Sequence, residues 1–196
     1  MRPIINSLPT IDTKVRVRST NYLLLFLLGL PTLLLSQEYK IVTIADLEWM
    51  TENLNIEVEG SCCYNNNPDN CEKFGRLYTW EGAMNACPEG WHLPSDAEWR
   101  QTIDHLGGDK IAHDRLKIGG DSGFNAVMGG GIETEGSHMD LNIRSFYWTS
   151  TDLLNDYAWY YYFYLVDYDT YGESPMRLVY NKRGGGSVRC VKNTQK

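Results

Sequence analysis

The sequence lacks the short motifs that mark common metal centres and hydrolytic active sites. Its four histidines follow no His-Glu-x-x-His spacing and no Cys-x-x-Cys pair is present, so a zinc site is not expected. There is no Gly-x-Ser-x-Gly sequence, and no pair of carboxylates stands out from ordinary surface acids. These absences favour a protein that is not an enzyme and holds no cofactor.

Long hydrophobic runs are also missing. The apolar stretch at residues 23–35 has only about 13 residues, whereas a membrane-spanning helix needs about 20. Basic residues precede the stretch, Pro31 interrupts it, and the polar residues Ser36 and Gln37 follow. This order predicts a signal peptide at 1–36 and a mature domain at 37–196, secreted or at the cell surface, with no membrane span after cleavage. An uncleaved anchor is the alternative, because Leu34 stands where a cleavage site usually has a small residue.

The expected mature domain has little positive charge. The formal charge of the 196 residues is −7, and removal of 1–36 takes away four basic residues and one acidic residue, which makes the charge −10. A protein this acidic repels nucleic acid phosphates and anionic lipid headgroups. We therefore expect no nucleic-acid partner.

All five cysteines follow the expected signal peptide, and in an oxidising compartment cysteines are first interpreted as disulfides. Cys63 and Cys71 flank a turn-rich segment, and a bridge between them would stabilise by roughly 2–3 kcal/mol on the chain-entropy argument. Cys87 at the end of an expected helix and Cys190 in the last expected strand are the natural long-range pair, worth about 5 kcal/mol. Cys62 is then left over.

The first half of the mature domain shows one strand and two helices. The β-branched residues 41–44 predict a strand, and residues 61–70 are dense in turn formers and predict a loop. Apolar side chains at three- and four-residue steps from Leu77 to Cys87 predict a helix that Pro88 ends. Ser95 and Glu98 have the spacing of a capping box, so a second helix is expected from there to the glycines at 107–108.

The second half is expected to be mainly β-structure. Residues 119–137 are rich in glycine and predict a loop. Aromatic and β-branched runs predict strands, joined near the end by a turn at 181–186: 146–149, 159–166, 176–180 and 187–191. The order of elements predicts an α+β domain with two helices early and a twisted antiparallel sheet with long loops.

Five stretches, in order, resemble the secreted bacterial family known as the Fibrobacter succinogenes major paralogous domain. The most specific is the Cys-Pro-x-Gly-Trp-His-Leu-Pro-Ser sequence at 87–95. The five stretches cover essentially the whole mature domain: 43–55, 71–80, 86–95, 148–151 and 187–192.

The resemblance implies a C-type-lectin-like fold, related to the branch that contains formylglycine-generating enzymes and sulfatase-modifying factors. Residues 92–99 are similar to that branch's Arg-Leu-Pro-Thr-Glu-Ala-Glu-Trp signature. The bridge from helix to last strand in that fold agrees with pairing of Cys87 and Cys190. The family more often has a bulky or neutral residue where this chain has Cys62, so the partner of Cys71 is either Cys63 or Cys62.

The catalytic and metal-binding features of these relatives are absent. The formylglycine-generating branch uses a reactive cysteine pair late in the chain, where this sequence has only Cys190. The Glu-Pro-Asn or Gln-Pro-Asp and Trp-Asn-Asp sequences of Ca²⁺-dependent sugar-binding lectins are not present. Asp167, Asp169 and Glu173 surround a turn but lack the third side-chain ligand of an EF-hand loop, so we expect a solvated turn; Ca²⁺ is the alternative.

An aromatic run at 157–164 is the most suggestive candidate for a binding surface. In a strand, Tyr160, Tyr162 and Tyr164 point to one side and Tyr161 and Phe163 to the other. One side is expected in the core, and the three tyrosines are the candidate surface that stacks on sugar rings or docks a protein. The alternative is that both sides are covered.

The expected function is therefore binding or adhesion at the bacterial cell surface, with a protein or glycan partner. The alternatives are a structural subunit of an envelope assembly and, third, an enzyme of the sulfatase-modifying type.

Overall fold

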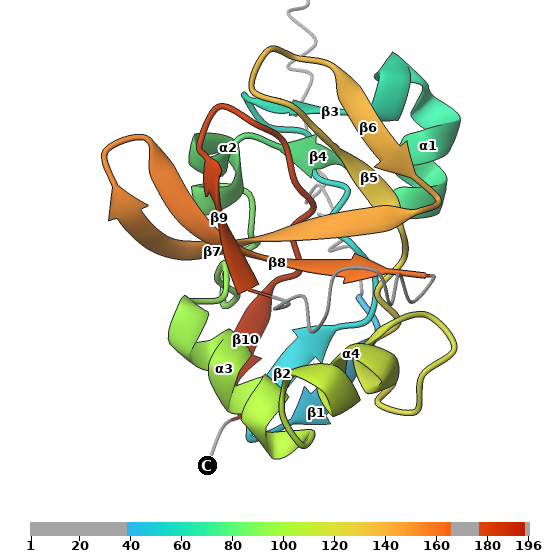
Figure 1. The fold of residues 1–196 in the computed structure, drawn as a ribbon, viewed down its shortest axis with the longest axis vertical. Coiled ribbons are helices and arrows are strands. Elements are labelled where there is room, and N and C mark those ends of the chain that lie inside the picture. The colour runs from blue at the N-terminus through green and yellow to red at the C-terminus, as the bar shows by residue number, and fades with distance from the viewer. Residues whose placement is uncertain (1–38, 166–176, 195–196) are drawn as a thin grey trace, which may run out of the picture. The chain divides into compact units, whose positions relative to one another are not determined.

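The computed structural model describes residues 39–165 and 177–194, so the expected signal peptide at 1–36 lies outside the described range (Figure 1). In the described residues, no helix is both long enough and apolar enough to cross a membrane.

The described strands form three sheets (Figure 1). The first has the order β1-β2-β10: β1 (Ile41–Ile44), β2 (Leu47–Met50) and β10 (Val191–Asn193). The second is a short pair: β3 (Ser61–Cys62) and β4 (Leu77–Tyr78). The third has the order β6-β5-β7-β8-β9: β5 (Gly129–Ile132), β6 (His138–Leu141), β7 (Arg144–Leu154), β8 (Tyr157–Tyr164) and β9 (Arg177–Asn181). All strand pairs are antiparallel except β5 with β7, and the α+β class is as expected.

The described residues contain four α-helices and one short 3₁₀ helix, so the expectation of two helices is wrong. They are η1 (Tyr64–Asn66), α1 (Pro68–Phe74), α2 (Trp80–Met84), α3 (Asp96–His105) and α4 (Asp109–Leu116). Residues 61–70 are not a loop, because Pro68 suits the first helical position and the Asn67 side chain accepts a hydrogen bond from the Asp69 N–H. Helix α4 begins at once after Gly108, whose φ of +86° reverses the chain there.

The other helices follow local signals to different degrees. In α3 the Ser95 hydroxyl and the Glu98 carboxylate form the expected capping box. The helix expected over Leu77–Cys87 is shorter. Leu77 pairs with Cys62 in a sheet, and α2 begins only at Trp80, where the Thr79 side chain caps it.

One strand in the second half of the domain could not be recognised in the sequence, because it consists mainly of glycine. Strand β5 lies inside the segment that was expected to be a loop, and its three glycines carry no β-strand signal. A Cβ on Gly131 would lie 2.6 Å from the Phe146 ring. Packing therefore requires glycine at a strand position. The last strand is also displaced, since β10 begins only at Val191.

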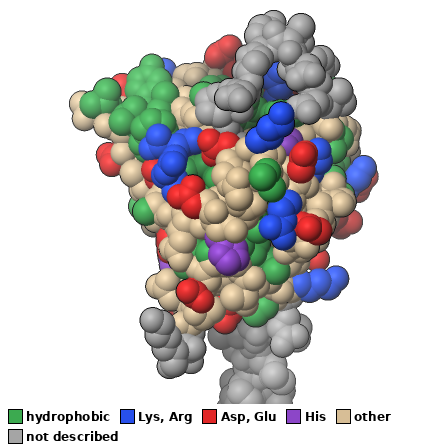
Figure 2. Space-filling view, turned by 60° about the horizontal axis from the view of Figure 1, so that its bottom comes forward, with side chains coloured by type: hydrophobic (Ala, Val, Ile, Leu, Met, Phe, Trp, Pro, Cys, Tyr) green, Lys and Arg blue, Asp and Glu red, His purple; other side chains and the backbone are tan. Residues whose placement is uncertain are grey.

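Two apolar clusters form the core. In the first, Trp49 and Trp99 lie side by side with ring centroids 4.7 Å apart, and Tyr161 stacks on Trp99 at 4.9 Å. The second contains Trp148 and Cys190. Figure 2 shows charges of both signs mixed over one face, and apolar side chains gathered at the tip of the β7–β8 hairpin.

Two disulfides, one local and one long-range, are present in the described chain. They are Cys63–Cys71 and Cys87–Cys190, the pairs that the sequence favoured, and Cys62 is a free thiol. Disulfides are typical of proteins in oxidising compartments outside the cytoplasm.

Candidate functional site

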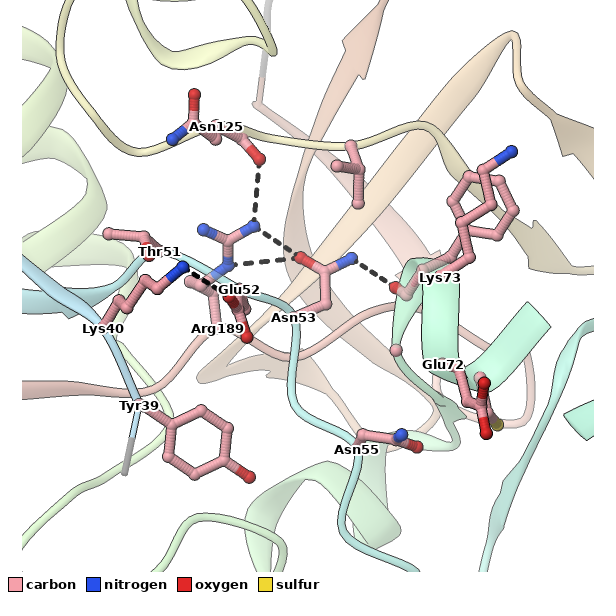
Figure 3. A pocket seen from close by; sticks show the side chains of 14 residues that line it. Tyr39, Lys40, Thr51, Glu52, Asn53, Asn55, Glu72, Lys73, Asn125 and Arg189 are labelled. Carbon is pink, nitrogen blue, oxygen red and sulfur yellow. Dashed lines mark hydrogen bonds and ion pairs between the residues drawn. The ribbon is translucent and has the colours of Figure 1, made fainter. Parts of the chain in front are cut away.

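An open cavity of about 450 Å³ lies where the two ends of the described domain meet α1 (Figure 3). Its wall comes from Tyr39 and Lys40 before β1, residues 51–53 and Asn55 after β2, residues 71–75 at the end of α1 and its C-cap, and the loop before β5. Arg189, which precedes β10, forms part of the floor. The volume is within the range of pockets that hold small ligands.

The floor is built around the fully buried guanidinium of Arg189. Its Nε and Nη2 atoms donate to Asn53 Oδ1 at 3.2 and 2.6 Å, and Nη2 also donates to the Asn125 carbonyl. Its Nη1 atom donates to the carbonyls of Met50 and Phe124. A guanidinium has five N–H groups, and all are used here.

Arg189 is a buried cation without a carboxylate partner in the described part of the chain. Burial lowers the pKa of Arg189, but a guanidinium keeps its proton under physiological conditions. Neutral acceptors and the Phe124 ring, 4.4 Å from the guanidinium carbon, surround it instead. The floor of the cavity is therefore rigid and electropositive.

Asn53 fixes the guanidinium and joins three segments. Its Nδ2 atom donates to the carbonyl of Phe74 at 2.8 Å and to the Ser187 hydroxyl at 3.3 Å. Its Oδ1 atom also accepts the Tyr147 hydroxyl at 2.9 Å. The neighbouring Gly75 has a φ of +78°, and a Cβ there would lie 2.6 Å from the Asn53 Cβ. Asn53 and Arg189 thus shape the cavity and have no hydrogen-bonding capacity left for a ligand.

The rim carries the groups that are accessible to a ligand. Figure 3 shows Lys40 and Glu52 on one side, with their charged atoms 3.9 Å apart, and Glu72 and Lys73 of α1 on the other. The Asn55 amide lies between the two sides. The rim therefore offers donors and acceptors of both signs to a polar molecule.

Among the described residues, the lining of the cavity offers no free thiol. Its cysteine, Cys71, is in a disulfide. The free thiol of Cys62 is half-buried elsewhere, and burial raises its pKa, which disfavours the reactive thiolate.

A serine, a histidine and a glutamate do meet at the start of α3, but not as a catalytic triad. The Ser95 hydroxyl accepts the Glu98 N–H and donates to Glu98 Oε2 at 2.8 Å, so it caps the helix. His92 Nε2 contacts the other oxygen of Glu98 at 2.6 Å. Burial works to raise the pKa of Glu98, but the hydrogen bonds from Ser95 and His92 outweigh it and the pKa is lowered.

The candidate tyrosine surface is only partly at the surface. The expectation is wrong for Tyr160, which is 8% exposed because Trp148 and Tyr180 pack against its ring. Burial raises the pKa of Tyr160 to about 12. Tyr162 and Tyr164 are half-buried, with ring centroids 5.9 Å apart. At Tyr160 and Tyr161 both sides of β8 are covered, which was the alternative expectation.

The candidate Ca²⁺ ligands Asp167, Asp169 and Glu173 lie outside the described residues. Within 39–165 and 177–194, no three His, Cys, Asp or Glu side chains are grouped to hold a metal ion.

Sequence reasoning did not find the cavity. Asn53 and Arg189 lie in two of the stretches that carry the family resemblance, 43–55 and 187–192, but they are 136 residues apart in sequence. The only local signal was an arginine between Val188 and Cys190, in a segment expected to be a strand.

Fold and site define a disulfide-bonded α+β domain with a polar, open cavity. Residues 42–192 match the Fibrobacter succinogenes major domain, and the chain belongs to that family. Comparison with curated proteins and with solved structures gave no match.

Proposed function

We propose that this protein is a non-catalytic binding module at the bacterial cell surface or in the surrounding medium, and that the cavity over Arg189 holds a hydroxyl-rich ligand such as the end of a glycan. The observation that carries this proposal is the contrast between floor and rim. The floor is fully hydrogen-bonded and buried, whereas the rim presents an amide and both charge signs to solvent.

Sugar hydroxyls donate and accept hydrogen bonds, so a rim with ammonium, amide and carboxylate groups suits them. A preformed floor lowers the ordering cost of binding. The electropositive Arg189 below the rim also favours a sugar that carries a carboxylate over one that carries an amine.

We also propose a C-type-lectin-like fold for the domain. The support is the bridge from Cys87, just after α2, to Cys190, immediately before the last strand, together with the presence of the first and last strands in one sheet. The sulfatase-modifying alternative requires a pair of reactive cysteines, and the described residues contain one free thiol.

A glycan array, run with and without a chelator, tests the function. We expect binding to at least one acidic or neutral glycan that survives chelation. Glu72→Gln and Asn55→Ala should each weaken that binding about tenfold, because each removes a rim contact of about 1.4 kcal/mol. Glu89→Gln, at an exposed glutamate outside the cavity, is the matched control and should bind like the wild type.

Two results would contradict the proposal. The first is that the protein binds no glycan on the array. The second is full binding by both rim variants together with loss in Tyr162→Ala, which would move the site to the half-buried tyrosines of β8, Tyr162 and Tyr164.

A further inference from the structure

The open edge of β9 coincides with an exposed apolar surface. Strand β9 is the last in the order β6-β5-β7-β8-β9 and pairs only with β8 among the described strands. Around it lies a set of partly exposed side chains, defined here as the hairpin patch: Leu153, Leu154, Tyr157, Leu178 and Val179. Leu154 is the most exposed at 68%, and Figure 2 shows the apolar cluster at the hairpin tip.

The register of β8 and β9 identifies the backbone groups that face outward. Lys182 N–H donates to the Asp156 carbonyl, directly opposite it in the register. Hydrogen-bonded and non-bonded pairs alternate in an antiparallel ladder, so Tyr180 and Leu178 bond to β8. The N–H and C=O of Val179, between them, point to the open edge.

Proteins usually protect such an edge with a proline, a charged side chain or a bulge. The charged residue of β9, Arg177, is held by an ion pair with Asp96. The residues that follow it, 178–180, are Leu, Val and Tyr, and the β8–β9 register has no shift. The surface therefore has what a strand-adding partner needs: unpaired backbone groups flanked by apolar side chains.

We propose that the open edge of β9 binds an extended, acidic segment of another protein by strand addition. The positive charge of Arg183 beside β9 favours a partner with acidic residues. Arg183 lies two residues beyond β9, is exposed, and has no ion pair within the described part of the chain. An acidic residue at the end of an added strand would pair with it.

A second copy of this chain fits the edge less well. An antiparallel pair of β9 strands centred on Val179 would place the segment 177–183 of one copy against that of the other, and this segment contains no acidic residue that could pair with Arg183.

The inference is tested with a labelled seven-residue peptide that has valine at alternate positions, threonine between them and aspartate at both ends. Fluorescence anisotropy measures its binding to the full domain. Val179→Pro removes one outward N–H and no β8–β9 hydrogen bond, and should weaken binding at least tenfold. Val179→Ile keeps the N–H and is the matched control. Arg183→Glu should also weaken binding at least tenfold.

Variants of the peptide test the same contacts on the wild-type protein. Their result therefore does not depend on whether Val179→Pro folds. A peptide N-methylated at its central valine, and a peptide with lysine ends, should each bind wild-type protein at least tenfold more weakly. The inference is overturned if the N-methylated peptide binds as well as its parent, or if no peptide binds. It is also overturned if the protein is a dimer by light scattering and Val179→Pro makes it a monomer. None of these results bears on glycan binding in the cavity.

Discussion

Replacement of Asn53 by alanine tests whether the floor of the cavity is held as described. The change removes a hydrogen-bond partner from four buried groups: the Phe74 carbonyl, the Ser187 hydroxyl, the Tyr147 hydroxyl and the Arg189 guanidinium, which loses its partner at both Nε and Nη2. An unsatisfied buried group costs about 1–3 kcal/mol, and more when it is charged. Entry of water from the cavity reduces this cost, so we expect a loss of about 3–5 kcal/mol in the free energy of unfolding.

Urea unfolding with the disulfides intact measures this loss, and Asn55→Ala is the matched control. Asn55 is an asparagine two residues away that also lines the cavity, and its side chain makes no described hydrogen bond. Its replacement should change the free energy of unfolding by less than about 0.5 kcal/mol. A loss below about 1 kcal/mol for Asn53→Ala would refute the reasoning, because the buried network would then contribute no more than a surface contact.

Three further predictions concern stability. Removing the long-range bridge by replacing Cys87 and Cys190 with alanine should cost up to about 5 kcal/mol, measured by urea unfolding; a loss below 1 kcal/mol would contradict it. Ser95→Ala should cost about 1 kcal/mol through the lost cap of α3, seen as a lower melting temperature; an unchanged melting temperature would contradict the capping role. The pKa of Tyr160 is raised in the folded protein, so its contribution is complete below pH 10 and is lost as pH rises toward 12. Tyr160→Phe should therefore lose less stability than the wild type between pH 9 and 11, and equal losses would refute this.

Local signals predicted part of the fold well. The capping box at Ser95 uses residues three positions apart, so the sequence alone contains the whole interaction. The positions of Cys87 at the end of an expected helix and of Cys190 in the last expected strand also favoured the long-range pair that the structure contains. Strand β5 could not be predicted, because its glycines are there for the close packing of Phe146.

The candidate site depended on contacts that a single sequence does not show. Alternation along β8 correctly placed Tyr160 and Tyr161 on opposite sides, but it did not reveal that Tyr180 of β9 covers Tyr160. Likewise, nothing local to Arg189 indicates that Asn53, near the other end of the domain, accepts two of its hydrogen bonds.

An amide NMR titration with the strongest array ligand tests the central claim most directly. If the rim of the Arg189 cavity is the binding site, the resonances of Lys40, Thr51, Asn55 and Glu72 should shift progressively and saturably. Shifts confined to Tyr162 and Tyr164, or no saturable shift at all, would contradict the account.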